Sequence, residues 1–165
     1  MKRHNVLILL SHDHHHGLLL AQLLKKSAPA YKGLPSDTLG KINYAIEKFN
    51  SELTIHFKDE EKILFPILKG KDLEVDKLIG ELIEEHKKLR EKIISLKDIP
   101  DPEDTMDEIG YLLESHIRKE ERNLFQKAQQ VLVEEELSDI ELSINQSRKE
   151  FVKTCSANNN SDEKI

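Results

Sequence analysis

One motif in this chain pairs a histidine with a glutamate at the spacing of a helical turn, and it occurs twice. The motif H-x3-E-E-x2-L-F occupies residues 56–65 and recurs at residues 116–125. Residues i and i+4 of a helix lie on the same face, so each copy can direct an imidazole and a carboxylate at one point. Two such faces meeting inside a protein would form a metal site.

A lone histidine precedes each copy of the motif. His14 precedes the first copy and His86 precedes the second, so the two halves of the chain follow the same pattern. All of these polar residues interrupt apolar stripes, where their burial is costly unless each has a partner. Binding to a common metal centre would give all of these residues a partner. The predicted metal ligands are His14, His56, Glu60, His86, His116 and Glu120.

The donor atoms of this set indicate which metal it would hold. Imidazole nitrogens with carboxylate oxygens suit iron, manganese or zinc better than calcium or copper(I), and paired carboxylates can bridge two ions. The simplest arrangement gives His14 and His56 to one ion and His86 and His116 to the other. The two carboxylates then bridge, and open coordination positions permit binding of dioxygen, peroxide, nitric oxide or water.

Several neighbouring residues leave alternatives open. Helix phase selects His14 from a local histidine cluster, with His15 as the alternative and the others expected in solvent. The second glutamate of each motif copy lies about 100° further around the helix, which favours solvation over ligation. Extra ligands could come from Glu61, Glu85 or Glu121; Tyr44 and Tyr111 could donate hydrogen bonds to ligands, and Phe65 and Phe125 are expected in the core.

Helical periodicity predicts the elements that would position these residues. Apolar stripes predict helices over residues 5–27, 36–65, 73–96 and 102–133, with Ser36 capping the second helix and Pro66 ending it. A weaker stripe predicts a further helix over about 136–153. We therefore expect an all-α fold, an antiparallel up-down-up-down four-helix bundle with an additional C-terminal helix. The domain would span residues 1–153, with its core at 5–133 and a flexible tail at 154–165.

Composition and charge exclude several classes of function. The 165 residues are 38% hydrophobic and 34% charged, which is typical of helices with sharply divided faces. The net charge of −6 comes without a basic block, so we expect no nucleic-acid partner. No apolar run is long enough to span a membrane, and a histidine cluster interrupts the apolar N-terminal run that a secretory signal would need. With Cys155 as the single cysteine, the sequence favours a cytoplasmic protein.

At the repeated motif and at residues 10–18, the chain resembles the hemerythrin-like, HHE cation-binding family over roughly residues 5–133. The resemblance implies a four-helix bundle with a non-haem di-iron centre held by the six residues above. Oxygen-carrying hemerythrins have a His-x3-His pair on the third helix and a His-x4-Asp pair on the fourth. Here Leu82 and Arg90 flank His86 at that spacing, and His116 pairs with Glu120. The missing histidine shifts the expected role from oxygen carriage toward sensing, storage or redox chemistry.

The leading functional hypothesis is a cytoplasmic di-iron protein that binds or senses dioxygen, peroxide or nitric oxide. Such a sensor would act through a protein partner, with the C-terminal helix or the flexible tail as the contact. The alternatives are a di-iron enzyme of peroxide or dioxygen chemistry, an iron-handling or metal-centre repair protein, and a protein with structural zinc. Nothing in the sequence indicates a substrate pocket, so the hypothesis of an enzyme stays open.

Overall fold

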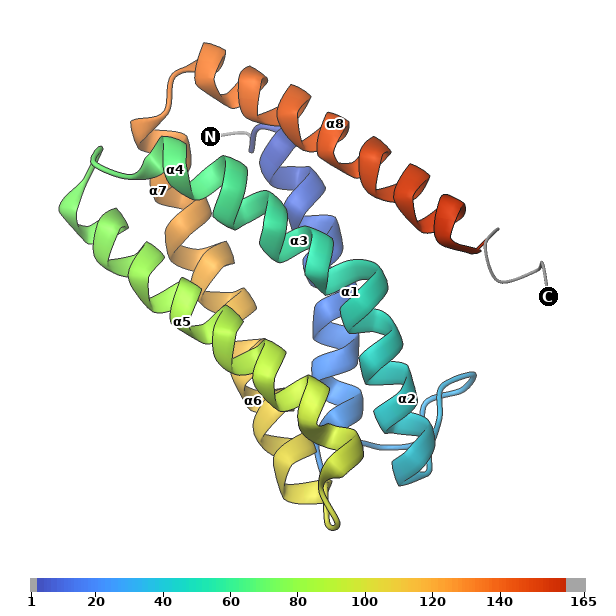
Figure 1. The fold of residues 1–165 in the computed structure, drawn as a ribbon. Helices are drawn as coiled ribbons and strands as arrows, with labels where there is room; N and C mark the ends of the chain where they lie inside the picture. Colours follow the sequence, from blue (N-terminus) through green and yellow to red (C-terminus); the bar gives the residue numbers. More distant parts are fainter. Residues whose placement is uncertain (1–2, 160–165) are drawn as a thin grey trace.

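Helices form all the regular structure in the computed structural model, which describes residues 3–159 and the side chains of residues 3–152. Four helical rods pack side by side, and a long last helix lies across them (Figure 1). Within the described residues there is no strand, and none of the helices is both long and apolar enough to cross a membrane. The predicted all-helical fold is confirmed, and the up-down-up-down order stays a prediction.

The four rods consist of segments that follow one another without a break in the helical path. The first is α1 (Asn5–Leu24), and the third is α5 (Leu73–Ser95) with the short 3₁₀ segment η3 (Leu96–Asp98). The second rod contains α2 (Thr38–Lys48), η1 (Phe49–Leu53), α3 (Thr54–Asp59), η2 (Glu60–Leu64) and α4 (Phe65–Leu68). The fourth contains α6 (Glu103–Lys119), η4 (Glu120–Leu124) and α7 (Phe125–Val131), and α8 (Glu134–Asn159) follows it.

Both ends of the second rod differ from the sequence prediction. Asp37, rather than Ser36, caps the rod, because its carboxylate accepts a hydrogen bond from the Gly40 backbone N–H at 2.8 Å. The rod also continues past Pro66 to the end of α4. Pro66 lies in the first turn after a wide π turn, where a proline's missing N–H and fixed φ are tolerated.

A π turn begins at the first glutamate of both motif copies. The segments η2 and η4 start at Glu60 and Glu120, and each is closed by a backbone hydrogen bond between residues five apart. The sequence predicted regular helix at both places, so these turns correct that expectation. π turns within α-helices occur frequently at functional sites, because the extra residue redirects the side chains around it.

The core consists of two apolar clusters, one toward each end of the bundle. One cluster includes Leu10, Leu64 and Phe125, and the other includes Ala21, Phe57 and Leu113. In each rod, the predicted ligands lie in the sequence where the residues of one cluster give way to those of the other. His56 and His116 directly precede Phe57 and Ile117, the last residues of the second cluster in their rods. The bundle therefore contains a polar layer between two apolar ones.

The last helix, α8, packs on the bundle and extends further than predicted. Its side chains Leu137, Ile140 and Ile144 are buried in the first of the two clusters, and it contacts α1, α3 and η2. The helix continues to Asn159, whereas the sequence placed its end near residue 153 and a flexible tail after it. Residues 160–165 of that tail lie outside the described residues, and the domain boundary stays a prediction.

Candidate metal centre

The structure brings all six predicted ligands together in the middle of the bundle. Each rod contributes, and no member of the set is more than 3% exposed. The contributing elements are α1 for His14, α3 for His56, η2 for Glu60, α5 for His86, α6 for His116 and η4 for Glu120. Helix periodicity accounts for the convergence, because each residue takes the place of an apolar side chain in an inward stripe.

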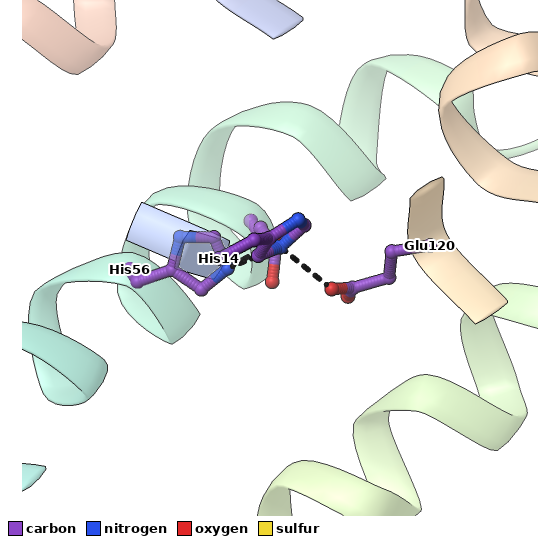
Figure 2. A group of neighbouring side chains, drawn as sticks. His14, His56 and Glu120 are labelled. Atoms are coloured by element: carbon purple, nitrogen blue, oxygen red, sulfur yellow. Dashed lines mark hydrogen bonds and ion pairs between the residues drawn. The ribbon is translucent and has the colours of Figure 1, made fainter. Parts of the chain in front are cut away.

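One half of the layer combines His14 and His56 with both glutamates. The two Nε2 atoms lie 3.1 Å apart, and His14 Nε2 lies 3.0 Å from Glu120 Oε2. Glu60 Oε1 lies 3.5 Å from His56 Nε2. Figure 2 shows His14 between the His56 ring and the Glu120 carboxylate. One atom from each of these four residues lies within 4.8 Å of the others, a spacing that a single cation can bridge.

The other half repeats this geometry with His86 and His116. Their Nε2 atoms also lie 3.1 Å apart. Glu120 Oε1 lies 3.2 Å from His116 Nε2, and Glu60 Oε2 lies 3.4 Å from His86 Nε2. Each glutamate thus directs one oxygen to each half, in the arrangement that the sequence suggested for two bridged ions. Metal binding by these residues stays a prediction.

A carboxylate accepts a hydrogen bond from the Nδ1 atom of every histidine in the layer. Such a bond fixes the orientation of the ring and leaves Nε2 with a free electron pair for a metal. We call these four carboxylates the braces. They are Glu121 on His14 (2.6 Å), Asp13 on His56 (3.0 Å), Glu61 on His86 (2.7 Å) and Glu85 on His116 (2.9 Å).

The braces form a closed ring through the bundle. The first rod supplies the brace for the second, the second for the third, the third for the fourth, and the fourth for the first. Each brace is also the sequence neighbour of a candidate ligand on its own rod. Every rod therefore supplies donor atoms to the centre and orients a histidine of another rod.

A basic side chain stands behind each brace and favours its ionised form. Burial raises the pKa of Glu121, but hydrogen bonds from His14, Ser11 and Arg3 outweigh it and lower this pKa to about 2. The pKa values of the other three braces are lowered by the same balance of burial against hydrogen bonds. The basic partners are Arg3 for Glu121, Arg148 for Asp13, Arg90 for Glu61 and Lys119 for Glu85.

The sequence pattern does not predict these roles. It assigns no role to Asp13, it places Glu61 and Glu121 in solvent or as extra ligands, and it offers Glu85 as an extra ligand. The prediction that Tyr44 and Tyr111 donate hydrogen bonds to the ligands is wrong. Tyr111 is 55% exposed beside Lys25, and Tyr44 lies beside Lys48. An acid directly adjacent to a predicted ligand, present on all four rods, is the sequence signal that could have identified the braces.

The aromatic residues and the local histidine cluster take the places that the sequence predicted. His14 is buried, whereas His15 and its neighbours at positions 12 and 16 are exposed. Phe65 and Phe125 are core residues, and their rings stack on those of His86 and His14 at centroid distances of 6.0 and 5.3 Å. These contacts add a steric constraint to the braces' control of ring orientation.

The buried donor set fits a cation. When each ring carries its single proton on Nδ1, none of the four carboxylate oxygens of Glu60 and Glu120 has a hydrogen-bond donor among the described residues. The nearby Nε2 atoms are within contact distance, but rings whose single proton is on Nδ1 have none to donate there. Two facing Nε2 electron pairs 3.1 Å apart repel unless a proton or a metal lies between them. Buried acceptors without donors are costly, so the layer calls for positive charge.

Protons supply that charge when no metal does. Burial lowers the pKa of His14, but hydrogen bonds to Glu120 and Glu121 raise it to about 9. Burial likewise opposes protonation of His116, whereas the charge and hydrogen bond of Glu120 raise its pKa to about 10. One histidine of each facing pair therefore holds a proton firmly at neutral pH in the metal-free protein, and a metal must displace it.

Comparison with known proteins assigns the bundle to a described class. The family model for the hemerythrin HHE cation binding domain matches residues 6–128, which include all six candidate ligands. The match covers more than half of the chain and ends within α7, so α8 follows it. No curated protein and no solved structure matches the chain.

Proposed function

Because the chain belongs to the hemerythrin HHE cation-binding family, we propose that it holds two non-haem iron ions in the polar layer and binds or senses dioxygen, peroxide or nitric oxide. His14 and His56 would hold one ion, His86 and His116 the other, and Glu60 and Glu120 both. The observation that carries the proposal is that two groups of four donors share the same two carboxylates. Zinc or manganese would fit the same donors.

Iron would supply open coordination positions and one-electron chemistry toward a small oxidant. The residues around the proposed ions define their environment. The braces keep each Nδ1 proton in place, and the two apolar clusters exclude bulk water on either side of the layer. Leu82, which is fully buried, stands one turn before His86, so the third rod presents a single imidazole. Each ion would therefore have two imidazoles and two shared carboxylates.

Burial of the layer favours binding or sensing over the alternative functions. Because the candidate ligands are at most 3% exposed, only a molecule small enough to pass between packed side chains can reach them. Burial of the ligands therefore excludes direct contact with a bulky organic substrate. An enzyme acting on such a substrate would need that contact. Iron handling or repair would require release of the ion to an acceptor, and the buried, braced ligands favour retention.

The proposed location and partners of the protein are consistent with the composition of the chain. The protein would work in the cytoplasm without contact to nucleic acid or membranes, in keeping with its net charge of −6. A sensor of this kind would pass its signal to a protein partner. We assign the contact with a protein partner to α8, which follows the matched family domain.

Anaerobic purification with metal analysis, followed by an optical spectrum before and after exposure to air, tests the function. About two iron ions per chain and an air-dependent change in visible absorption are expected. Zinc with no response to air would contradict the proposal and identify a structural metal. The double variant His56→Ala/His116→Ala should lose the metal, whereas His16→Ala, which changes an exposed histidine beside Glu52, should retain it.

A further inference from the structure

Arg148 links the last helix to the metal centre. Three of the basic residues behind the braces precede α1 or lie on the rods themselves, at positions 3, 90 and 119. The fourth, Arg148, belongs to α8, which follows the family domain and lies across α1 and α3 (Figure 1). A side chain from outside the bundle therefore completes the support of one candidate ligand, His56.

The contacts of Arg148 form a continuous chain to His56. Its Nη2 and Nη1 atoms lie 2.6 and 3.3 Å from Asp13 Oδ2 and Oδ1, a two-point contact with one carboxylate. Asp13 Oδ2 in turn accepts the His56 Nδ1–H bond at 3.0 Å. A planar guanidinium that holds a carboxylate at two points fixes its position and its plane. The orientation of the His56 ring therefore depends on where α8 lies.

Arg148 also neutralises a second carboxylate beside the centre. Its Nε donates to Asp59 Oδ2 at 2.8 Å, and Asp59 is fully buried directly before Glu60 in the chain. The other Asp59 oxygen has no hydrogen-bond partner among the described residues. Displacement of Arg148 would leave a buried carboxylate without this cation next to the start of the π turn η2, which is strongly unfavourable.

The described part of α8 is held to the bundle in two different ways. Its first part is anchored by Leu137, Ile140 and Ile144, all buried in the apolar core. After Ile144, no side chain of residues 145–152 is fully buried, and Arg148 makes polar contacts with Asp13 and Asp59 of the bundle. The apolar anchor does not depend on the metal centre, whereas the Arg148 contact leads directly to it.

We propose that Arg148 is a positioning residue that couples the docking of the second part of α8 to metal binding by the His14/His56 half of the centre. The inference rests on the proposed metal function. A cation on His56 Nε2 withdraws electron density from the ring and strengthens the Nδ1–H bond to Asp13, which holds Arg148 in place. Coupling between two binding events is reciprocal, so a docked α8 increases metal affinity by the factor by which the metal favours docking.

The variant Arg148→Gln tests the coupling in the full chain, with two matched controls. Arg90→Gln removes the same kind of side chain from behind Glu61, on the other half of the centre and away from α8. Lys149→Gln makes the same charge change at an exposed neighbour on α8. Anaerobic titration with Fe(II), and with Zn(II) as a redox-silent probe, measures affinity, and hydrogen exchange of amides 145–152 with and without metal measures docking.

In the wild type, metal should slow hydrogen exchange over residues 145–152. Arg148→Gln should weaken one of the two ions by about 10–100-fold, as expected when a contact behind a metal ligand is lost. It should also abolish the effect of metal on exchange in this segment, while residues 137–144 stay protected. Arg90→Gln should weaken one ion and leave the response of α8 intact, and Lys149→Gln should behave as the wild type.

A second variant keeps the test decisive if the buried Asp59 charge unfolds Arg148→Gln. The double variant Arg148→Gln/Asp59→Asn removes that charge and should show the same two losses. Two results would overturn the coupling but not the proposed function. One is that folded Arg148→Gln or Arg148→Gln/Asp59→Asn binds both ions as tightly as the wild type. The other is that metal does not change hydrogen exchange of residues 145–152 in the wild type. Failure of the wild type to bind either metal would overturn the proposed function and the coupling with it.

Discussion

At the level of single residues, the centre depends on two kinds of group. The six candidate ligands face the metal, and four carboxylates accept hydrogen bonds from the Nδ1–H groups of the histidines. A histidine that ligates through Nε2 must keep its proton on Nδ1, and a carboxylate at that position stabilises this tautomer. The four braces do so at distances between 2.6 and 3.0 Å. Each brace therefore contributes to metal affinity without contacting the ion.

Replacement of one brace should weaken one ion and leave the fold intact. In Glu121→Gln, the neutral amide oxygen accepts more weakly from His14 Nδ1, so we expect metal affinity to fall by about 10–100-fold at that half. Competitive titration against a chelator of known affinity measures the change. Glu52→Gln, which alters the partner of the exposed His16, is the matched control, and equal affinities in the two variants would contradict the role of the brace.

The raised histidine pKa values predict how metal binding depends on pH. The metal must displace protons from His14 and His116, whose pKa values in the metal-free protein are about 9 and about 10. Apparent affinity should therefore rise as pH increases from 7 to about 10, and binding at pH 7 should release protons. Calorimetry in buffers of different ionisation enthalpy measures the release. Binding without proton release at pH 7 would contradict these pKa values.

The same shifts affect the stability of the metal-free protein. A histidine whose folded pKa lies above its ordinary value of 6.5 stabilises the fold fully below that value. This contribution decreases as pH rises from 6.5 through about 9 and 10. The melting temperature of the metal-free protein should therefore fall over this range, relative to that of the loaded protein, whose histidines are neutral throughout.

At the scale of elements, the rods are less regular than the sequence pattern indicates. The π turns η2 and η4 begin at the two shared glutamates, and η2 allows its rod to continue past Pro66. Spacing alone predicts regular helix at these places, because an inserted residue in a helical turn leaves the residue types on either side unchanged. Histidines of other rods contact the two glutamates at which these turns begin, and those contacts are tertiary.

Close packing of α1 against α6 depends on a glycine. A Cβ atom at Gly110 would lie 2.6 Å from the Ala21 carbonyl oxygen on α1, too close for any side chain. We expect Gly110→Ala to lower the free energy of unfolding by about 1–3 kcal/mol, measured by denaturant titration. Gly80→Ala on α5, where a Cβ would meet nothing within 4 Å, should instead raise it by about 0.5–1 kcal/mol. The same sign of change in both variants would contradict this account of the packing.

At the scale of the whole molecule, the polar layer connects all four rods between two apolar clusters. Because each rod supplies donors, a bound metal stabilises the folded bundle by mass action, by about 2.7 kcal/mol at a free metal concentration one hundred times the Kd. Removal of metal by a chelator should therefore lower the melting temperature, and restoring the metal should recover it. In the double variant His56→Ala/His116→Ala, the melting temperature should not respond to metal. A response equal to that of the wild type would place the ion elsewhere.

The all-helical class, the approximate extents of the helices and the six inward polar residues can be predicted from the sequence alone. These follow from the 3.6-residue period, a local property that each segment carries without reference to the others. His14 could be chosen over His15 for this reason, and the inward direction of Glu60 and Glu120 follows from their spacing to the preceding histidines.

The partners of those six residues, namely the braces and the basic side chains that contact them, depend on tertiary packing. Glu121 lies 107 positions from the histidine that it braces, and Arg148 lies 135 positions from Asp13. The side chain that meets the outer edge of an imidazole depends on how neighbouring helices are rotated and how closely they approach. Periodicity along one helix carries no information about that rotation, so the braces, the π turns and the contact from α8 appear only once the rods are packed.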